Sequence, residues 1–145
     1  MGMAANSRLT IAVHALGWMA LAQQQGRDQL TSDQVAASVN TNAVIIRRSL
    51  GDLRRAGLVT VRHGAGRGWT LARGPEDITL LDVYDAVERE PLFGMHHTEP
   101  NLECPVGKGI RPALGLIYEG AEQALRRELD RTSIADVLRQ IFQAP

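Results

Sequence analysis

Residues 40–73 read NTNAVIIRRSLGDLRRAGLVTVRHGAGRGWTLAR, and this stretch contains the signals that decide the fold. A helical pattern over residues 42–56 ends at Gly57, because glycine readily adopts the left-handed conformation that closes a helix. Two short runs of β-forming residues follow, 58–62 and 68–73, with a glycine-rich tip between them. The stretch therefore predicts a helix followed by a β-hairpin.

The same stretch concentrates positive charge. It contains seven arginines and one aspartate, a net charge of +6, whereas the whole chain has 16 basic and 16 acidic residues. The rest of the chain must therefore have a net charge of −6, which gives the molecule a basic face and an acidic remainder. A helix joined to a basic hairpin is typical of a unit that binds double-stranded DNA.

The residues before this stretch complete a helix-turn-helix. Residues Ser7–Gln24 have apolar side chains at helical spacing and predict a first helix. Thr31 and Gln34 form a capping-box pattern at the start of a short helix, Ser32–Val39. A tight turn at 40–41 then leads into the helix 42–56, and two short helices joined in this way form a helix-turn-helix. His14, among apolar neighbours in the first helix, is expected to be a packed core residue.

The helix 42–56 has two distinct faces. One stripe is apolar and is expected to pack inward: Ile46, Leu50 and Leu53. The opposite face is expected to read the major groove, because a guanidinium can bridge guanine O6 and N7 or bind a phosphate. Its members are Val44, Arg47, Arg48, Gly51 and Arg55. Backbone phosphate contacts are expected from Ser7, Arg8, Thr41 and Asn42, and wing contacts from His63 and Arg67.

The second half of the chain predicts three further parts. A helix is expected from residue 79 to about 90, followed by an irregular segment rich in proline and glycine. Such a long loop is usually functional or disordered. A long helix over 112–131 and a short one over 134–142 complete the chain. The predicted organisation is a DNA-binding domain (7–90), an effector loop (91–111) and a dimerisation region (112–142), in a mostly α fold with one small β-hairpin.

The predicted long helix has a continuous apolar stripe that could be core or a partner surface. We expect a two-fold homodimer through it, because two DNA-binding subunits match the two half-sites of a palindromic operator. The residues of this stripe are Leu114, Ile117, Ala121, Ala124 and Leu125. The sequence shows no apolar run of the roughly 18 residues that a membrane span requires. Its single cysteine suits a reducing cytoplasm.

The order of these elements, and the segments LRRAGLVTVRHGAGRGWTLAR, LARGPEDITLLDVYDAVE and RTSIADVL, resemble the Rrf2 family of winged-helix transcription regulators. The resemblance covers residues 7–142. It implies a dimeric DNA-binding regulator, expected to be a repressor, with a long helix that crosses between subunits. Family members that bind an iron–sulphur cluster have several cysteines before the long helix, whereas this chain has only Cys104. The chain therefore looks like the cluster-less, YwnA-like branch, and no cofactor is expected.

Other functions remain open at this point. Cys104 could sense oxidants as a lone thiol in a flexible loop, or it could be a buried, inert cysteine, which is the more common role. The signal could also be a small-molecule ligand that binds between this loop and the long helix. An iron–sulphur or metal-dependent sensor of the same family would need unusual ligands. A metal hydrolase that uses His96, His97 and Glu99 lacks a helical spacing such as HExxH. A winged helix that binds only protein partners is the last alternative.

Overall fold

Helix α3 (Ala43–Arg55) forms where the sequence predicts it, in a computed structural model that describes residues 7–62 and 68–143. The helix starts at Asn42, whose side-chain oxygen accepts a hydrogen bond from the Ile45 backbone N–H over 3.0 Å. It ends just before Gly57, which has a φ of 77°. The end at Gly57 matches the predicted stop signal, whereas the cap at Asn42 was not predicted, because this residue was counted as part of the helix.

Two helices precede α3 and complete the predicted helix-turn-helix. Helix α1 spans Ser7–Gln24, and α2 spans Ser32–Val39 with a complete capping box between Thr31 and Gln34. Asn40 makes the turn into α3 in the left-handed conformation, with a φ of 62°. The core that these helices share is built from small and aliphatic side chains, with Leu16, Leu50 and Leu53 all 0% exposed.

The predicted β-hairpin forms as strands β1 (Val59–Arg62) and β2 (Gly68–Leu71), paired antiparallel. Both are shorter than predicted, because β1 starts one residue later than expected and β2 ends two residues earlier. After β2 the backbone no longer pairs as a strand, and the chain turns in the 3-10 helix η1 (Pro75–Asp77). Trp69 also exchanges two backbone hydrogen bonds with Leu30, of 2.7 and 3.0 Å, which attach the hairpin to the chain just before α2.

Helix α4 (Leu80–Val87) and helix α6 (Ile134–Gln143) close the body of the protein. Helix α4 begins at a second capping box, formed by Thr79 and Asp82, and it ends earlier than the expected position near residue 90. Pro91 disfavours helical backbone at the residue before it, which limits how far α4 can continue. Helix α6 packs against α1, and backbone hydrogen bonds attach its start to the segment before α4.

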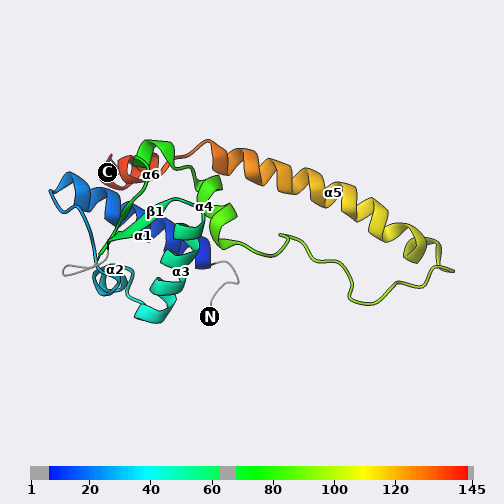
Figure 1. Cartoon of the computed structure of the whole chain (residues 1–145). Helices are drawn as coiled ribbons and strands as arrows, with labels where there is room; N and C mark the ends of the chain where they lie inside the picture. Colours follow the sequence, from blue (N-terminus) through cyan, green and yellow to red (C-terminus); the bar gives the residue numbers. More distant parts are fainter. Residues whose placement is uncertain (1–6, 63–67, 144–145) are drawn as a thin grey trace.

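Helix α5 (Pro105–Asp130) projects from this body as a long arm (Figure 1). The segment 88–104 contains no helix or strand and runs out along the same arm. It packs on the helix through stacked rings of Phe93 and Tyr118, whose centroids lie 4.5 Å apart. The Arg111 guanidinium donates to the backbone oxygens of His96 and Thr98 over 3.1 and 2.8 Å. No helix in the described ranges is long and apolar enough to cross a membrane.

The predicted start of the long helix at residue 112 is wrong. The helix begins at Pro105, and Pro112 lies inside it. Proline is favoured in the first turn of a helix, so both prolines gave a plausible start signal. Residues 105–111 consequently belong to the helix and not to the predicted effector loop.

Candidate nucleic-acid interface

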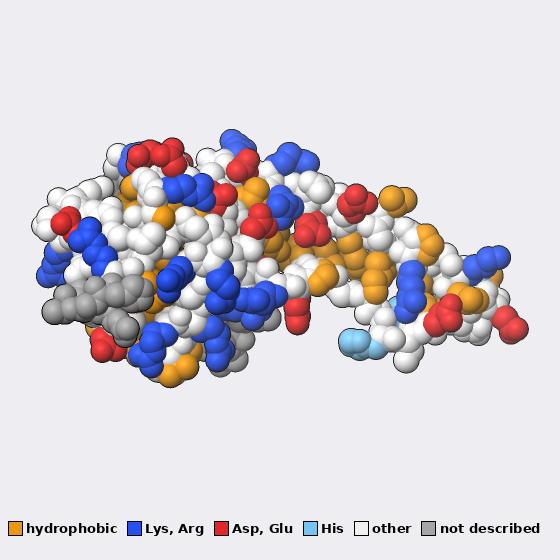
Figure 2. All heavy atoms as spheres, in the orientation of Figure 1, with side chains coloured by type: hydrophobic (Ala, Val, Ile, Leu, Met, Phe, Trp, Pro, Cys, Tyr) orange, Lys and Arg blue, Asp and Glu red, His pale blue; other side chains and the backbone are white. Residues whose placement is uncertain are grey.

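Helix α3 presents opposite faces to the core and to solvent, as predicted. Ile46, Leu50 and Leu53 are all 0% exposed, whereas Val44 is 56% exposed. The arginines of the helix are all exposed: Arg47, Arg48, Arg54 and Arg55. Figure 2 shows Lys and Arg side chains gathered on the lower part of the body, where Figure 1 places α3. The structure thus brings the predicted major-groove residues together on one surface.

Among the described residues, most of this positive charge has no acidic partner. Arg55 pairs with Asp52 of the same helix, and Arg89 donates to the same Asp52 oxygen over 2.6 Å. In the described ranges, no acidic side chain forms an ion pair with Arg47 or Arg48. Unpaired guanidinium groups on an exposed helix are free to bind phosphates or base edges.

Gly51 lies on the same outward face. A Cβ atom at this position would meet only the end of the Arg55 side chain, at 3.6 Å, among the described residues. No neighbouring helix therefore requires a glycine here, although glycine weakens a helix by about 1 kcal/mol relative to alanine. Close approach of an external surface, such as a DNA backbone, would explain a glycine at this position.

The predicted phosphate contacts lie at the edges of this surface. Ser7 is the first residue of α1, and Arg8 follows it with its guanidinium 3.7 Å from the Glu88 carboxylate. Asn42 uses its side-chain oxygen to cap α3, so only its amide N–H groups remain for another contact. Thr41 is half-buried beside it. The wing residues His63 and Arg67 lie outside the described residues.

Arg89 is a member of this surface that the sequence pattern did not indicate. It follows α4 and donates a hydrogen bond to Asp52 of α3, a residue 37 positions earlier in the chain. Neither helical periodicity nor local charge could reveal a contact between residues so far apart. Arg89 adds a fourth cation beside Arg8, Arg48 and Arg55.

Two expectations about single residues are wrong. His14 is exposed and not a core residue, and its Nε2 is 3.0 Å from the hydroxyl of Ser38 in α2. Cys104 is exposed and not buried, and it is the residue immediately before α5. Hydrogen bonds from the backbone N–H groups of Gly107 and Val106 lower the pKa of the Cys104 thiol below its usual value. The thiol therefore has the properties of a reactive cysteine.

The described residues do not fit a metal or an iron–sulphur cluster within one chain. No three His, Cys, Asp or Glu side chains of the described ranges gather where they could hold a metal ion. Cys104 is the only cysteine of the sequence, whereas clusters are held mostly by several thiolates. His96, His97 and Glu99 are exposed on the segment beside α5 and form no such group.

Helix α5 has an exposed apolar surface. It has no buried residue in the single chain, although the predicted dimerisation residues lie along it. Ile117 is 62% exposed, Ala121 and Ala124 are exposed, and Leu114 and Leu125 are half-buried. Figure 2 shows hydrophobic side chains along the underside of this arm.

Known proteins resemble the chain over nearly its whole length. The model of the Rrf2 family, described as an iron-dependent transcriptional regulator, matches residues 5–140. YwnA of Bacillus subtilis (strain 168), provisionally named as an HTH-type transcriptional regulator, is 41% identical over 139 residues, covering 94% of this chain and 98% of that protein. The HTH-type transcriptional regulator IscR of Cereibacter sphaeroides is 28% identical over 128 residues, covering 88% of this chain and 82% of that protein.

Solved structures show the same fold. A crystal structure provisionally described as a DNA-binding protein is 37% identical, with a TM-score of 0.72, over 91% of this chain and 99% of that one. The structure of T. potens IscR, at 23% identity, has a TM-score of 0.70 over 97% of this chain and 90% of that one. Family members are transcriptional regulators and not enzymes. The winged helix, the basic face of α3 and these similarities lead to one conclusion: the chain belongs to the Rrf2 family of DNA-binding transcriptional regulators.

Proposed function

We propose that the chain is a homodimeric repressor that works in the cytoplasm and binds a palindromic DNA operator. Helix α3 enters the major groove, the hairpin lies beside it, and α5 pairs the two subunits. The observation that carries this proposal is the two-faced structure of α3. Its inward residues are fully buried, and its outward face presents exposed arginines, of which Arg47 and Arg48 form no ion pair with an acidic side chain of the described residues.

The proposed DNA contacts divide by their role. Base readout is assigned to the outward residues of α3, and phosphate contacts to the residues at the start of α1 and before α3. The base-reading set is Val44, Arg47, Arg48, Gly51 and Arg55, and the phosphate set is Ser7, Arg8, Thr41 and Asn42. His63 and Arg67 are proposed as wing contacts. Base contacts specify a sequence, whereas phosphate contacts position the protein on it.

The first test is selection of bound sites from random DNA, followed by titration of the selected operator. We expect the enriched sites to be palindromic and the affinity to fall steeply as salt concentration rises. Arg47→Ala should weaken operator binding about tenfold, because a base-reading arginine contributes about 1–3 kcal/mol. Arg131→Ala is the matched control, since Arg131 is an exposed arginine that pairs with Glu128 at the far side of the fold.

Two results would contradict this proposal. The first is an absence of salt-dependent binding to any DNA at low ionic strength, which would favour a winged helix that binds protein partners. The second is enrichment of single, unpaired half-sites, which would retain DNA binding but exclude the paired arrangement. An unchanged operator affinity of Arg47→Ala would remove Arg47 alone from the base-reading set.

Helix α5 supports the homodimer. A projecting helix of 26 residues with exposed apolar side chains leaves a surface that soluble proteins usually cover. A second copy of the same helix is complementary to it, because small residues such as Ala121 and Ala124 permit close packing. Two subunits paired through α5 would present two α3 helices to the two half-sites of an operator.

The signal is proposed to act through Cys104. Its thiol is exposed at the start of the proposed dimer helix, and two backbone N–H groups stabilise the thiolate. Oxidation of this thiol would add bulk and polarity where the segment 88–104 turns into α5. A change there could alter how the two subunits are spaced on the operator.

Alkylation by iodoacetamide tests the thiolate directly. Only the thiolate reacts, so the rate should rise at a lower pH than the pKa of about 8.5 of an unperturbed cysteine. The same chain in denaturant is the control, because unfolding removes the backbone hydrogen bonds and should return the rate profile to the usual value. An identical profile in both states would contradict the stabilisation of the thiolate. If Cys104→Ser keeps both full operator affinity and the wild-type response to peroxide, Cys104 is not the sensor.

A further inference from the structure

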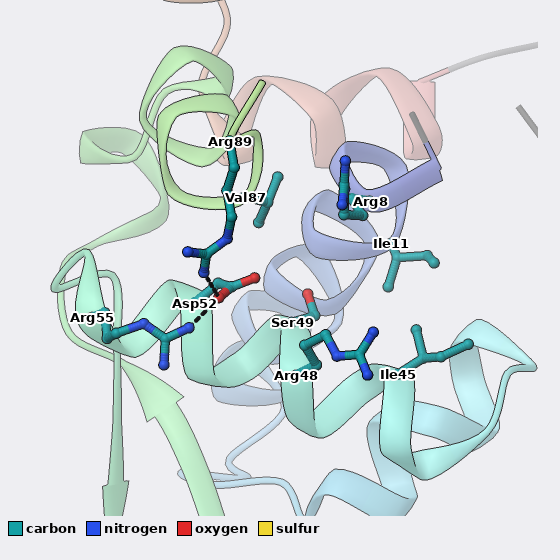
Figure 3. Close-up of a pocket in the computed structure, with 9 residues that line it drawn as sticks. All are labelled: Arg8, Ile11, Ile45, Arg48, Ser49, Asp52, Arg55, Val87 and Arg89. Atoms are coloured by element: carbon teal, nitrogen blue, oxygen red, sulfur yellow. Dashed lines mark hydrogen bonds and ion pairs between the residues drawn. The ribbon is translucent and has the colours of Figure 1, made fainter. Parts of the chain in front are cut away.

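A cavity of 290 Å³ opens between helices α1, α3 and the end of α4. It lies behind the arginine face of α3, and Figure 3 shows the side chains that line it. Such a volume is at the lower end of the range for small-molecule sites. The lining residues are Arg8, Ile11, Ile45, Arg48, Ser49, Asp52, Arg55, Val87 and Arg89.

The charge of this cavity favours an anion. Its lining has four arginines and one aspartate, and Glu88 next to it pairs with Arg8 over 3.7 Å. Four cations against these two carboxylates leave a net charge of +2. Arg55 and Arg89 both donate to Oδ1 of Asp52, so one carboxylate oxygen serves two guanidinium groups. Each guanidinium has five N–H donors, and most of these donors remain available to a ligand.

A buried hydroxyl without a partner points to the same conclusion. Ser49 is 8% exposed, and its Oγ forms no hydrogen bond with any described residue. Figure 3 shows this hydroxyl pointing from α3 into the space between α3 and α1. Buried polar groups in proteins nearly always have a hydrogen-bond partner, and an unpaired one lowers stability. A ligand oxygen in the cavity would supply the missing acceptor.

The remaining walls are apolar. Ile11 comes from α1, Ile45 from α3 and Val87 from α4, and all three face the cavity. A DNA phosphate would use the arginines but would leave these aliphatic side chains without a contact. A ligand that combines an acidic group with a short hydrocarbon portion would use both parts of the lining.

We propose that this cavity binds a small monocarboxylic acid with an apolar tail and that the bound acid weakens operator binding. The carboxylate accepts hydrogen bonds from Ser49, Arg48 and Arg89, and the tail packs on the aliphatic walls. The effect on DNA rests on the proposed function, because Arg48 and Arg55 line the cavity and also belong to the proposed base-reading set. An arginine that binds the acid is withdrawn from the DNA.

Calorimetric titration of the full-length, DNA-free protein tests binding. The probes are acetate, isovalerate and phenylacetate, and phenylacetamide is the uncharged control of the same shape. We expect saturable binding that improves with the size of the tail, and at least about tenfold weaker binding of phenylacetamide. Absence of saturable binding of all three acids up to about 10 mM would overturn the proposal.

Two variants locate the site. Ser49→Ala and Arg89→Gln should each weaken phenylacetate binding about tenfold, because each removes a hydrogen bond to a charged group. Arg131→Gln is the control for the lost charge and should bind phenylacetate like the wild type. Ser49→Ala should keep or raise the melting temperature of the ligand-free protein, because it removes a buried hydroxyl that forms no hydrogen bond with any described residue. Equal phenylacetate affinity of all these variants would place the bound acid elsewhere and overturn the proposal.

Operator titrations with and without phenylacetate test the regulatory step. We expect phenylacetate to raise the operator Kd of the wild type, and to raise it much less for Ser49→Ala. If the protein binds no DNA but still binds phenylacetate through Ser49, the proposed function fails and the acid site stands. If Ser49→Ala weakens DNA binding while no acid binds, the cavity holds an operator phosphate and the proposal is overturned.

Discussion

Ile117→Glu is expected to make the protein monomeric and to weaken operator binding at least about a hundredfold. The Ile117 side chain is 62% exposed on α5, in the centre of the proposed dimer surface. A glutamate there would bring two negative charges into an apolar interface, where neither has a partner. Loss of the dimer removes the second half-site contact, and linked binding of two sites commonly contributes a factor of 10² to 10⁴. Sedimentation velocity and operator titration measure the two effects separately.

Gln123→Glu is the matched control for this change. It introduces the same charge on the same helix, two residues after Ala121 and thus on the opposite side of the helix from it. This variant should remain dimeric and keep the wild-type affinity. The melting temperature of isolated subunits should be similar in both variants, since both side chains are exposed in the single chain. A dimeric Ile117→Glu protein with wild-type affinity would show that the interface lies elsewhere.

The residues of α3 show how much of the fold local chemistry determines. Asn42 provides a cap, Gly57 a left-handed stop, and the stripe from Ile46 to Leu53 a single buried side. All three signals lie within one stretch of the chain and agree with one another. The Gly57 stop and the apolar stripe were sufficient to predict this helix without the Asn42 cap, and similar local signals predicted α1, α2 and the position of the hairpin.

The sequence did not determine features for which two local signals compete, or features that depend on contacts between distant residues. Pro105 and Pro112 both suit a helix start, and local sequence alone does not distinguish them, whereas the structure starts the helix at Pro105. The exposure of Cys104 follows from that same arrangement. The proposed acid-binding cavity was beyond prediction, because it depends on Arg89 reaching Asp52 and on Ser49 forming no hydrogen bond with any described residue.

Leu50→Ala is expected to lower the free energy of unfolding by about 2–5 kcal/mol, because the truncation leaves a cavity in a packed core. Leu50 is 0% exposed. Val44→Ala on the same helix should change that free energy by less than about 0.5 kcal/mol, because Val44 is 56% exposed. Urea unfolding of the two variants provides the comparison.

For operator affinity, Val44→Ala should have the larger effect and Leu50→Ala the smaller one. Val44→Ala removes an apolar group that we expect to contact a thymine methyl, so it should weaken binding roughly fivefold. Leu50→Ala should bind like the wild type wherever it remains folded, since its side chain faces away from the DNA. If both variants lose stability equally, the assignment of the two faces is wrong. If Val44→Ala keeps full affinity, specificity depends on the arginines alone, because Val44 is the apolar member of the proposed base-reading set.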